Sequence, residues 1–336
     1  MGTTDFLNPL KKIASLMYQG ATWMDRQRHE AHILSRPVVS VGNIAMGGRS
    51  KTPFVVEIAR GLKERGFEPV VLTRGYGRKN IQPYWLIPAR LDLGDIYKSL
   101  EPCVEDSGDE ALETYVRSDV PVLISADRTK EATEFLKKAP PLRWVFLLDD
   151  GFQHWALERD VDIVLTDESD FHSKVFPEGH LREDVRSLER ADVVLTLGRD
   201  FQKTTVLRAH PPLGAACGVL TTRATNSLGA RDYEEFFTEQ FEHMKVLRLA
   251  DHAAASKIQA AIAKTKRQHW ILGLKEAVKI LNWREIQTFY KTGSVVVEKG
   301  PLAQHHFYFA DYELKVKQAD VLWVKLLEKV KVRELL

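Results

Sequence analysis

The feature that most constrains this fold is a short apolar run that breaks into a glycine-rich loop and is followed by a helix-like segment. Residues 37–53 read PVVSVGNIAMGGRSKTP. Glycines in such a loop let backbone N–H groups point at phosphate oxygens, and the N-terminus of the next helix adds partial positive charge. Lys51 can reach the β- and γ-phosphates, and the Thr52 hydroxyl can hold Mg²⁺. The segment predicts a strand–loop–helix unit that binds a nucleoside triphosphate.

The loop departs from the usual G-x-x-x-x-G-K-[ST] pattern at two positions. Ala45 stands at the first glycine and Ser50 at the last, so the double glycine 47–48 has to supply the flexibility. A glycine-rich turn beside an ordinary lysine is the plainer alternative. The candidate nucleotide-binding residues are Met46, Gly47, Gly48, Arg49, Ser50, Lys51, Thr52 and Pro53.

Strand-like and helix-like segments alternate from residue 37 to about residue 200. The expected strands are nearly continuous apolar runs, which is typical of strands buried on both faces. They span 37–41, 69–72, 120–125, 144–148, 161–166 and 191–197, and the expected helices span 52–65, 107–118, 128–138 and 181–190. The pattern predicts an α/β fold of the P-loop NTPase type, with a mostly parallel sheet covered by helices on both faces.

Four parts are expected along the chain. They are an N-terminal amphipathic helix (1–30), a P-loop domain (31–215), a smaller α/β domain that closes a cleft (216–313) and a basic C-terminal helix (314–336). In the smaller domain we expect strands at 245–249, 270–272, 294–298 and 306–309 and helices at 253–264 and 275–281. The C-terminal helix can pack back on the P-loop domain.

The N-terminal helix allows two interpretations. Its apolar residues recur at helical spacing and are flanked by basic ones; they are Leu10, Ile13, Met17, Ala21 and Met24, with Lys11, Lys12, Arg26 and Arg28 beside them. Such a helix can lie in a membrane interface, or it can dock its apolar face on its own domain.

Composition excludes several classes of protein. The chain of 336 residues is 44% hydrophobic and 28% charged, as soluble globular proteins are. A net charge of +2 gives no global field for nucleic acid, so no nucleic-acid partner is expected. Cys103 and Cys217 form no metal-ligand cluster and fit a reducing compartment, although two cysteines can in principle pair. No apolar run approaches the roughly 20 residues of a spanning helix, and no signal peptide is expected.

Two carboxylates, Asp149 and Asp150, end the apolar run 144–148. Downstream of a phosphate loop, an acid at the carboxyl end of a strand is where Mg²⁺ is organised. Gln153 and His154 follow at the same edge. The plainer alternative is an acidic turn after a core strand. The candidate metal ligands are Thr52, Asp149 and Asp150.

Polar residues also gather at other strand ends. Arg74 and Tyr76 lie on a glycine-rich turn that suits an anionic, sugar-like ligand, although a solvated loop explains them too. Residues 107–110 predict a capping box in which Glu110 closes on Ser107. Asp109 then lies in the first helical turn, where it needs a partner to act as a base. The segment 177–183, PEGHLRE, is a further loop-to-helix junction. His252 follows Asp251 after an apolar stretch and could position its imidazole at a cleft edge.

Taken in order, these motifs resemble one family, the tetraacyldisaccharide 4'-kinases of lipid A biosynthesis. The motifs are VGNIAMGGRSKTP, TRGYGR, GDE, DDGFQH, PEGHLRE, ADH and LKEAVKI. The resemblance implies that ATP, with Mg²⁺, donates its γ-phosphoryl group to the 4'-hydroxyl of an acylated glucosamine disaccharide 1-phosphate. It also implies a peripheral protein on the cytoplasmic face of the inner membrane, and we expect a monomer.

The resemblance implies roles for particular residues. Lys51 and Thr52 would bind the phosphates and Mg²⁺, Asp149 and Asp150 would organise the metal, and Asp109 with His252 would form an acid–base dyad. The residues that would line the lipid headgroup site are Arg74, Gln153, His154, Arg182 and Glu183. Three departures from the family pattern stand out: Ser50 replaces a glycine, Ala253 a second histidine, and residues 273–276 (GLKE) the usual Thr-Glu-Lys-Asp.

Two rival functions remain. A P-loop switch such as a GTPase would need an Asn-Lys-x-Asp motif, which the chain lacks. A non-catalytic nucleotide- or lipid-binding protein derived from the kinase would have a decayed loop marked by Ser50. The retention of the other motif residues argues against decay.

Overall fold

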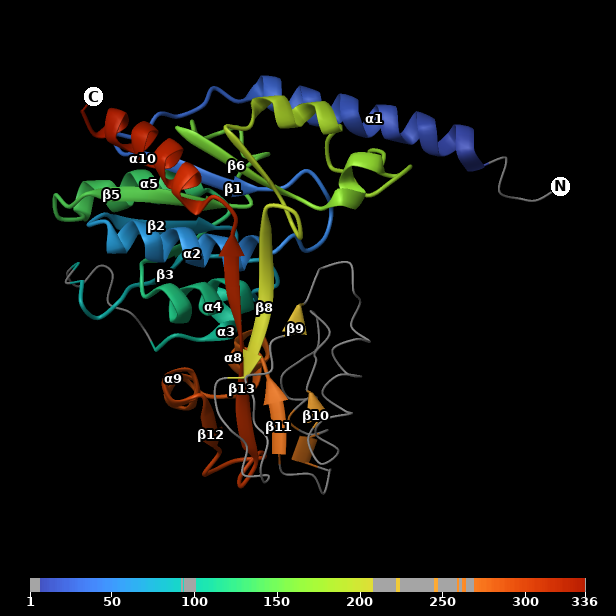
Figure 1. The fold of residues 1–336 in the computed structure, drawn as a ribbon. Coiled ribbons are helices and arrows are strands. Elements are labelled where there is room, and N and C mark those ends of the chain that lie inside the picture. The colour runs from blue at the N-terminus through green and yellow to red at the C-terminus, as the bar shows by residue number, and fades with distance from the viewer. Residues whose placement is uncertain are drawn as a thin grey trace. The chain divides into compact units, whose positions relative to one another are not determined.

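The computed structural model describes residues 7–91, 93, 101–207, 222–223, 245–246, 259, 262–263 and 269–335 (Figure 1). Its contacts divide the chain into two compact units. The first comprises Met1–Thr73, Asp127–Phe201 and Val316–Leu336, and the second comprises Arg74–Ala126 and Gln202–Lys315. The division therefore does not follow the expected boundary at residue 215, because residues 74–126 group with the second unit.

The first unit is built on parallel strands in the order β2-β5-β1-β6-β7. Their bounds are β1 Val38–Gly42, β2 Glu68–Thr73, β5 Trp144–Asp149, β6 Val161–Thr166 and β7 Val193–Thr196. Every residue of β1, β5 and β6 is buried, as the continuous apolar runs predicted. Val41 pairs with Asp149 in the β1–β5 register, so the carboxyl ends of these two strands meet at one edge.

Helices α2 (Lys51–Glu64) and α5 (Arg128–Lys138) flank this sheet together with the 3₁₀ helices η2 (Glu168–His172) and η3 (Val185–Arg190). Eight residues of α2 are buried, and its contacts fall on β2, β5 and β1. The predicted P-loop NTPase-like arrangement of a mostly parallel sheet flanked by helices is confirmed.

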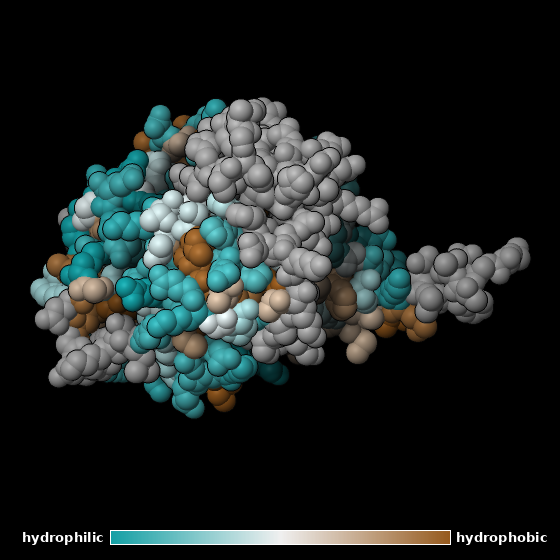
Figure 2. Space-filling view, turned by 90° about the horizontal axis from the view of Figure 1, so that it is seen from below, coloured by the Kyte–Doolittle hydropathy of each residue, from teal (hydrophilic) through white to brown (hydrophobic). Residues whose placement is uncertain are grey.

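Helix α1 (Leu7–Arg28) docks through small and polar residues rather than through its apolar stripe. Ser15 is buried, and its Oγ donates to the Val175 carbonyl over 3.1 Å, while the Tyr18 ring meets Phe176 edge-on at 5.8 Å. The large apolar side chains of the helix are 49–71% exposed; they are Leu10, Ile13, Leu16, Met17, Trp23 and Met24. Figure 2 shows brown, hydrophobic surface on this helix. In the part of the chain that the structure describes, no helix has the length and apolar character to cross a membrane.

Helix α10 (Ala319–Leu335) groups with the first unit and packs against α2. A Cβ on Gly61 of α2 would lie 2.1 Å from the Trp323 ring, so only glycine leaves room for this indole. The Arg65 guanidinium lies 4.0 Å from the same ring, and Lys329 pairs with Asp192 at 2.8 Å. The helix begins five residues later than expected because strand β13 continues to Val316.

The second unit is mixed α/β. Its helices are α3 (Val104–Ser107), α4 (Asp109–Ser118), α8 (Leu274–Ile280) and α9 (Trp283–Thr292), and β3 (Tyr84–Leu86) pairs antiparallel with β4 (Val122–Ile124). A second sheet has the order β10-β11-β13-β8-β9, with β12 paired to β13. Its strands are β8 Phe201–Leu207, β9 Thr222–Arg223, β10 Lys245–Val246, β11 His269–Leu272, β12 Ser294–Val296 and β13 His306–Val316.

A buried ion cluster ties α4 to β13. The Arg117 guanidinium donates to Glu113 over 2.9 Å and to Asp311, and it stacks 3.9 Å from the Tyr312 ring centroid. Each charge of the cluster has an opposite charge beside it, which is the condition for keeping such groups buried.

Two helix predictions were wrong. Leu181 pairs with Ala45 and Val175, the chain bends at residues 182–183, and only 185–190 form a helix, of the 3₁₀ type. Helix α4 is capped by Gly108 at φ 83°, and Ser107 instead donates its hydroxyl to the Cys103 carbonyl over 2.6 Å. The capping-box assignment of Ser107 and Glu110 is therefore incorrect. Most of the expected helix 253–264 lies outside the described residues.

Candidate active site

The loop between β1 and α2 has the form of a phosphate cradle. Asn43 is buried and donates from Nδ2 to the Gly47 carbonyl over 3.4 Å, which holds the loop in a curve. Gly47 has φ +93°, a conformation that side chains disfavour, and open space surrounds the Cβ positions of Gly47 and Gly48. The exposed face of the loop therefore leaves its backbone accessible to an anion. Met46, next to these glycines, is also exposed.

Ser50 takes the conformation that a glycine would take at the end of this loop. Its backbone is left-handed, at φ 56° and ψ 30°, and its side chain makes no cap hydrogen bond to α2. A left-handed backbone costs a residue with a Cβ about 1–2 kcal/mol. Ser50 thus adopts a backbone conformation typical of glycine at the expense of local strain.

The first turn of α2 presents the functional groups that a phosphate site needs. Lys51, Thr52 and Pro53 are its first three residues, and the first N–H groups of a helix have no partner within the helix. Pro53 lacks an N–H and is tolerated in the first turn. The Lys51 ammonium nitrogen lies 3.3 Å from Oδ1 of Asp150. The loop, the helix terminus and the end of β5 therefore form one site.

The two carboxylates after β5 differ in environment. Asp149 is buried, and Thr73 donates its hydroxyl to Oδ2 over 3.2 Å. Burial, and then the neighbouring Asp150 charge, raise the pKa of the Asp149 carboxyl above its usual range. Burial alone would raise the pKa of Asp150 as well, but Lys51 and Arg182 outweigh that effect and hold it below the usual range. The pKa values of these two neighbouring carboxyls are thus shifted in opposite directions.

Residues of the DDGFQH and PEGHLRE motifs meet beside Asp150. Arg182 donates from NH1 to both Asp150 oxygens, over 3.0 and 2.9 Å. Gln153 donates from Nε2 to the Asn43 carbonyl over 3.0 Å and to Oε1 of Glu183 over 2.9 Å. The second Glu183 oxygen accepts from Arg190 over 2.9 Å. Gln153, Arg182 and Glu183 are therefore joined to the phosphate loop.

Backbone pairing joins the same two segments. The N–H of Met46 donates to the His180 carbonyl over 2.8 Å, and the N–H of Arg182 donates to the Ile44 carbonyl over 2.6 Å. Ala45 and Leu181 form an antiparallel bridge between these bonds. Residues 180–182 therefore lie alongside the first part of the phosphate loop.

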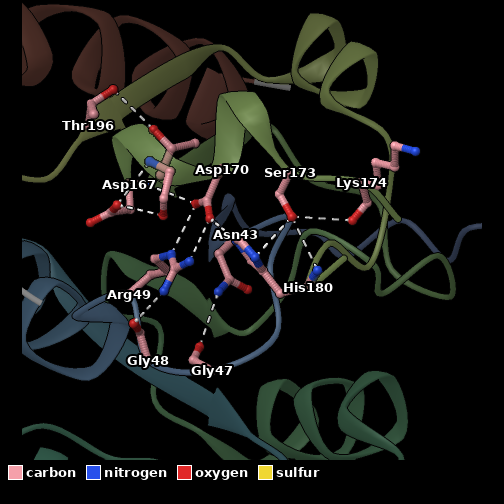
Figure 3. Close-up of polar contacts among 12 residues, drawn as sticks. Asn43, Gly47, Gly48, Arg49, Asp167, Asp170, Ser173, Lys174, His180 and Thr196 are labelled. Carbon is pink, nitrogen blue, oxygen red and sulfur yellow. Dashed lines mark hydrogen bonds and ion pairs between the residues drawn. The ribbon is translucent and has the colours of Figure 1, made fainter. Parts of the chain in front are cut away.

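Arg49 turns its side chain away from the loop and toward η2 (Figure 3). Its Nε and NH2 groups donate to the buried Asp170 carboxylate over 3.0 and 2.5 Å, and NH1 donates to the Gly48 carbonyl over 3.2 Å. Its guanidinium therefore holds the loop in place, and its backbone remains the part available to a phosphate.

The remaining predicted substrate residues are His154, Arg74 and Tyr76. Nδ1 of His154 is 3.0 Å from Arg128 and Nε2 is 3.5 Å from the Thr129 hydroxyl, so both ring nitrogens face helix α5. Arg74 and Tyr76 belong to the second unit, and both are exposed.

The predicted base, Asp109, begins helix α4 in the second unit and has a lysine partner. Its Oδ2 lies 2.8 Å from the ammonium nitrogen of Lys279, which projects from α8, and both side chains are largely buried. His252, the predicted dyad partner, lies outside the described residues.

Comparison with known proteins decides the family. The model of the tetraacyldisaccharide-1-P 4'-kinase family matches residues 4–310. The chain belongs to this family. A tetraacyldisaccharide 4'-kinase of Idiomarina loihiensis is 36% identical over 270 residues, which cover 76% of this chain and 78% of that one. One of Psychromonas ingrahamii is 33% identical over 233 residues, which cover 66% and 69%.

Other 4'-kinases align over shorter stretches. One of Neisseria gonorrhoeae is 35% identical over 175 residues, which are 51% of this chain. The aligned part spans about half the length of the N. gonorrhoeae and Methylobacillus flagellatus relatives, 47% and 46%. A crystal structure of LpxK from Aquifex aeolicus in complex with ATP has a TM-score of 0.68 and 22% identity, covering 97% of this chain and 99% of that one. This likeness confirms the fold.

Two residues of this 4'-kinase family member were missed by reasoning from its sequence. Asp170 follows strand β6 and holds Arg49, and its position just after a parallel strand was the signal that could have found it. Lys279 lies inside the LKEAVKI motif, but nothing in one sequence indicates that it faces Asp109.

Proposed function

We propose that this chain is an ATP-dependent kinase that phosphorylates the 4'-hydroxyl of an acylated glucosamine disaccharide 1-phosphate. The observation that carries the proposal is the meeting of Lys51 and Arg182 on Asp150, which joins the cation of a phosphate loop to the PEGHLRE segment. The family supports the same reaction, because its members are named tetraacyldisaccharide 4'-kinases.

In this reaction the sugar oxygen forms a bond to the γ-phosphorus while the bond between that phosphorus and the ADP oxygen breaks. The transition state carries its charge on the phosphoryl oxygens, so positioning and charge neutralisation supply most of the catalysis. Lys51 and the N-terminus of α2 supply positive charge from the protein. The loop N–H groups hold the phosphates in place.

The donor set suits Mg²⁺, which prefers oxygen ligands. No group of three or more His, Cys, Asp and Glu side chains gathers as a metal cage in the described part of the chain. Mg²⁺ commonly uses one or two carboxylates together with substrate phosphates and water, so Asp149 and Asp150 with the Thr52 hydroxyl are sufficient. The raised pKa of Asp149 fits this role, because a bound cation would favour its ionised form. When bound, Mg²⁺ would neutralise charge on the phosphates.

Asp109 is our candidate to accept the proton of the 4'-hydroxyl, and His252 is the candidate partner. A carboxylate can act as a general base when it is within hydrogen-bond reach of the proton it abstracts. Lys279 lies 2.8 Å from Oδ2 of Asp109, and Oδ1 accepts the backbone N–H of Glu110 over 3.0 Å. Each carboxylate oxygen has a second acceptor position that can serve the hydroxyl or a histidine.

We propose that the protein attaches to the cytoplasmic face of the inner membrane, and the exposed apolar stripe of α1 supports attachment to a membrane surface. A helix that docks through Ser15 and Tyr18 and turns its largest apolar side chains outward has the form of an interfacial helix. Lys11 and Lys12 flank the stripe and would favour anionic lipid. A membrane-bound kinase would collect its lipid acceptor from the same surface.

A phosphorylation assay with ATP, Mg²⁺ and the disaccharide lipid tests the function. We expect transfer by the wild type and a loss of roughly 10²–10³-fold or more in kcat for Lys51→Ala, the range for removing a group that stabilises transition-state charge. Lys63→Ala, in the last turn of the same helix, is the matched control and should keep full activity. ATP binding without transfer by the wild type would favour the non-catalytic alternative.

A further inference from the structure

Asp170 is a fully buried carboxylate that makes four hydrogen bonds (Figure 3). Two come from Arg49, over 3.0 and 2.5 Å, and a third comes from the backbone N–H of Asp167 over 2.9 Å. The fourth joins it to Nε2 of His180 over 2.8 Å. An ionised carboxylate only accepts and offers about four acceptor positions, so His180 carries its proton on Nε2 and every position of Asp170 is used.

The surroundings of Asp170 stabilise the ionised form of its carboxyl group. Burial alone would raise the pKa of this carboxyl, but the hydrogen bonds from Arg49, Asp167 and His180 outweigh burial and lower it below the usual range. Buried hydrogen bonds to an ionised group are the strong ones, and breaking one leaves a costly unsatisfied partner. Asp170 therefore ties Arg49 and His180 firmly to one point.

These two residues belong to different loops of the first unit. Arg49 lies in the phosphate loop, immediately before Ser50 and Lys51. His180 lies in the 177–183 loop, two residues before Arg182. The backbone bonds between 44–46 and 180–182 join the same loops at their other ends. A shift of either loop would thus have to break charged hydrogen bonds at Asp170 or move the other loop with it.

We propose that Asp170 is a positioning residue that makes the phosphate loop and the 177–183 loop move as one, so that a nucleoside triphosphate in the first and an anionic sugar headgroup at the second favour each other's binding. The proposal rests on the proposed function, since it takes Arg182 and Glu183 as headgroup ligands. A ligand that orders one loop also orders the other through Asp170. Binding of the second ligand then costs the protein less conformational entropy. The effect is reciprocal, and such couplings commonly amount to roughly 5–150-fold in affinity.

The test measures the affinity for a non-hydrolysable ATP analogue by calorimetry, with and without the disaccharide lipid in detergent micelles. We expect the lipid to tighten analogue binding by about 5-fold or more in the wild type. Arg49→Met and His180→Gln should each bring this ratio close to one. The double variant should show no further loss, because both side chains act through one carboxylate.

Matched variants separate positioning from general damage. Lys174→Met removes an exposed cation of the neighbouring segment and its ion pair with Glu178, and should keep the wild-type ratio. Arg49→Lys keeps the charge but not the two-bond geometry, so it should restore only part of the ratio. A merely structural role would lower melting temperature and both affinities while the ratio stays unchanged, and this outcome would overturn the proposal.

Measurements on the same preparation distinguish failure of the coupling through Asp170 from failure of the proposed kinase function. A wild-type ratio near one, with phosphoryl transfer intact, rejects the coupling and leaves the kinase assignment standing. A ratio that survives in Arg49→Met and His180→Gln rejects Asp170 as the link. Absence of transfer with normal analogue binding rejects the proposed function itself.

Discussion

Ser50 and Asp150 carry left-handed backbones, at φ 56° and φ 51°, although both have side chains. Each stands next to a residue with a proposed chemical role: Ser50 precedes Lys51, and Asp150 follows Asp149. Non-glycine residues keep such angles only when surrounding contacts enforce them, and they gather at functional sites. Here the enforcing contacts include the hydrogen bonds that Arg182 and Lys51 make to the Asp150 side chain.

Replacing Ser50 by glycine should raise stability without moving the loop. Relief of the left-handed strain should raise the free energy of unfolding by about 1–2 kcal/mol. The greater freedom of glycine in the unfolded chain should lower it by about 0.5–1 kcal/mol. Because Ser50 already has the angles of a glycine, we expect ATP affinity within about 2-fold of wild type. Thermal melting and calorimetry measure the two effects.

Gln318→Gly is the matched control for Ser50→Gly. Gln318 has φ 52° and is exposed in the first unit, so it should show a similar gain in stability with no change in ATP affinity. A lower melting temperature and weaker ATP binding in Ser50→Gly would mean that the serine side chain holds the loop.

Asp149→Asn should stabilise the protein at neutral pH and abolish transfer. The folded-state pKa of Asp149 is raised, so the stability it contributes is complete below the ordinary carboxyl pKa and is lost as pH rises through the raised value. At pH 7 the raised pKa disfavours the folded wild type relative to a side chain that does not titrate, so we expect Asp149→Asn to melt at a higher temperature. The difference in melting temperature should shrink as pH falls from 7 toward 4. Asp25→Asn, at an exposed carboxylate of α1, should change neither property.

At the scale of elements, we expect substitutions on the exposed apolar stripe of α1 and on its docked side to have different effects. Substituting glutamine for Leu16, Met17 and Trp23 together should weaken binding to anionic vesicles by about 10-fold or more, because each exposed side chain would lose its burial in lipid. Melting temperature should not change. The apparent KM for the lipid should rise more than the KM for ATP. Vesicle co-sedimentation, melting and kinetics on one preparation measure these effects.

Helix α10 provides the matched control for α1. Val321, Val324 and Val332 are also exposed, and glutamine at all three should leave vesicle binding intact. Tyr18→Ala tests the docked side of α1 and should lower the melting temperature instead. A large fall in melting temperature for the stripe variant, with sedimentation unchanged, would contradict an interfacial role.

Elements whose signal is local were predictable, and those set by distant pairing were not. The strands 144–148 and 161–166 are apolar runs, and the structure has them as β5 and β6 within one residue. Residues 181–183 were predicted to be helical, but Leu181 pairs with Ala45, about 136 residues away in the chain, and no local pattern reports such pairing. The approach of Lys51 to Asp150 follows from the pairing of β1 with β5. Asp170 belongs to no motif, and its position shortly after strand β6 was its one sequence signal.

At the scale of the whole molecule, the proposed chemistry draws on both units, with Lys51 in the first and Asp109 in the second. Asp109→Ala and His252→Ala should each lower kcat by roughly 10²-fold or more. The double variant should lose much less than the product, since a dyad acts as one unit. Fully multiplicative losses would show independent roles. If the non-additive partner of Asp109 proves to be Lys279 instead, the observed 2.8 Å pair is the working one.

The backbone of Ser50 bears on how such loops are found in genomes. A search pattern that demands glycine before the lysine discards this chain, although its φ and ψ of 56° and 30° are those a glycine would supply. Ligand geometry constrains the angles, and the residue type follows only as far as strain is tolerated. A search of computed structures for a run of backbone angles, in place of a residue pattern, would find candidate nucleotide-binding loops in which another residue stands at the glycine position.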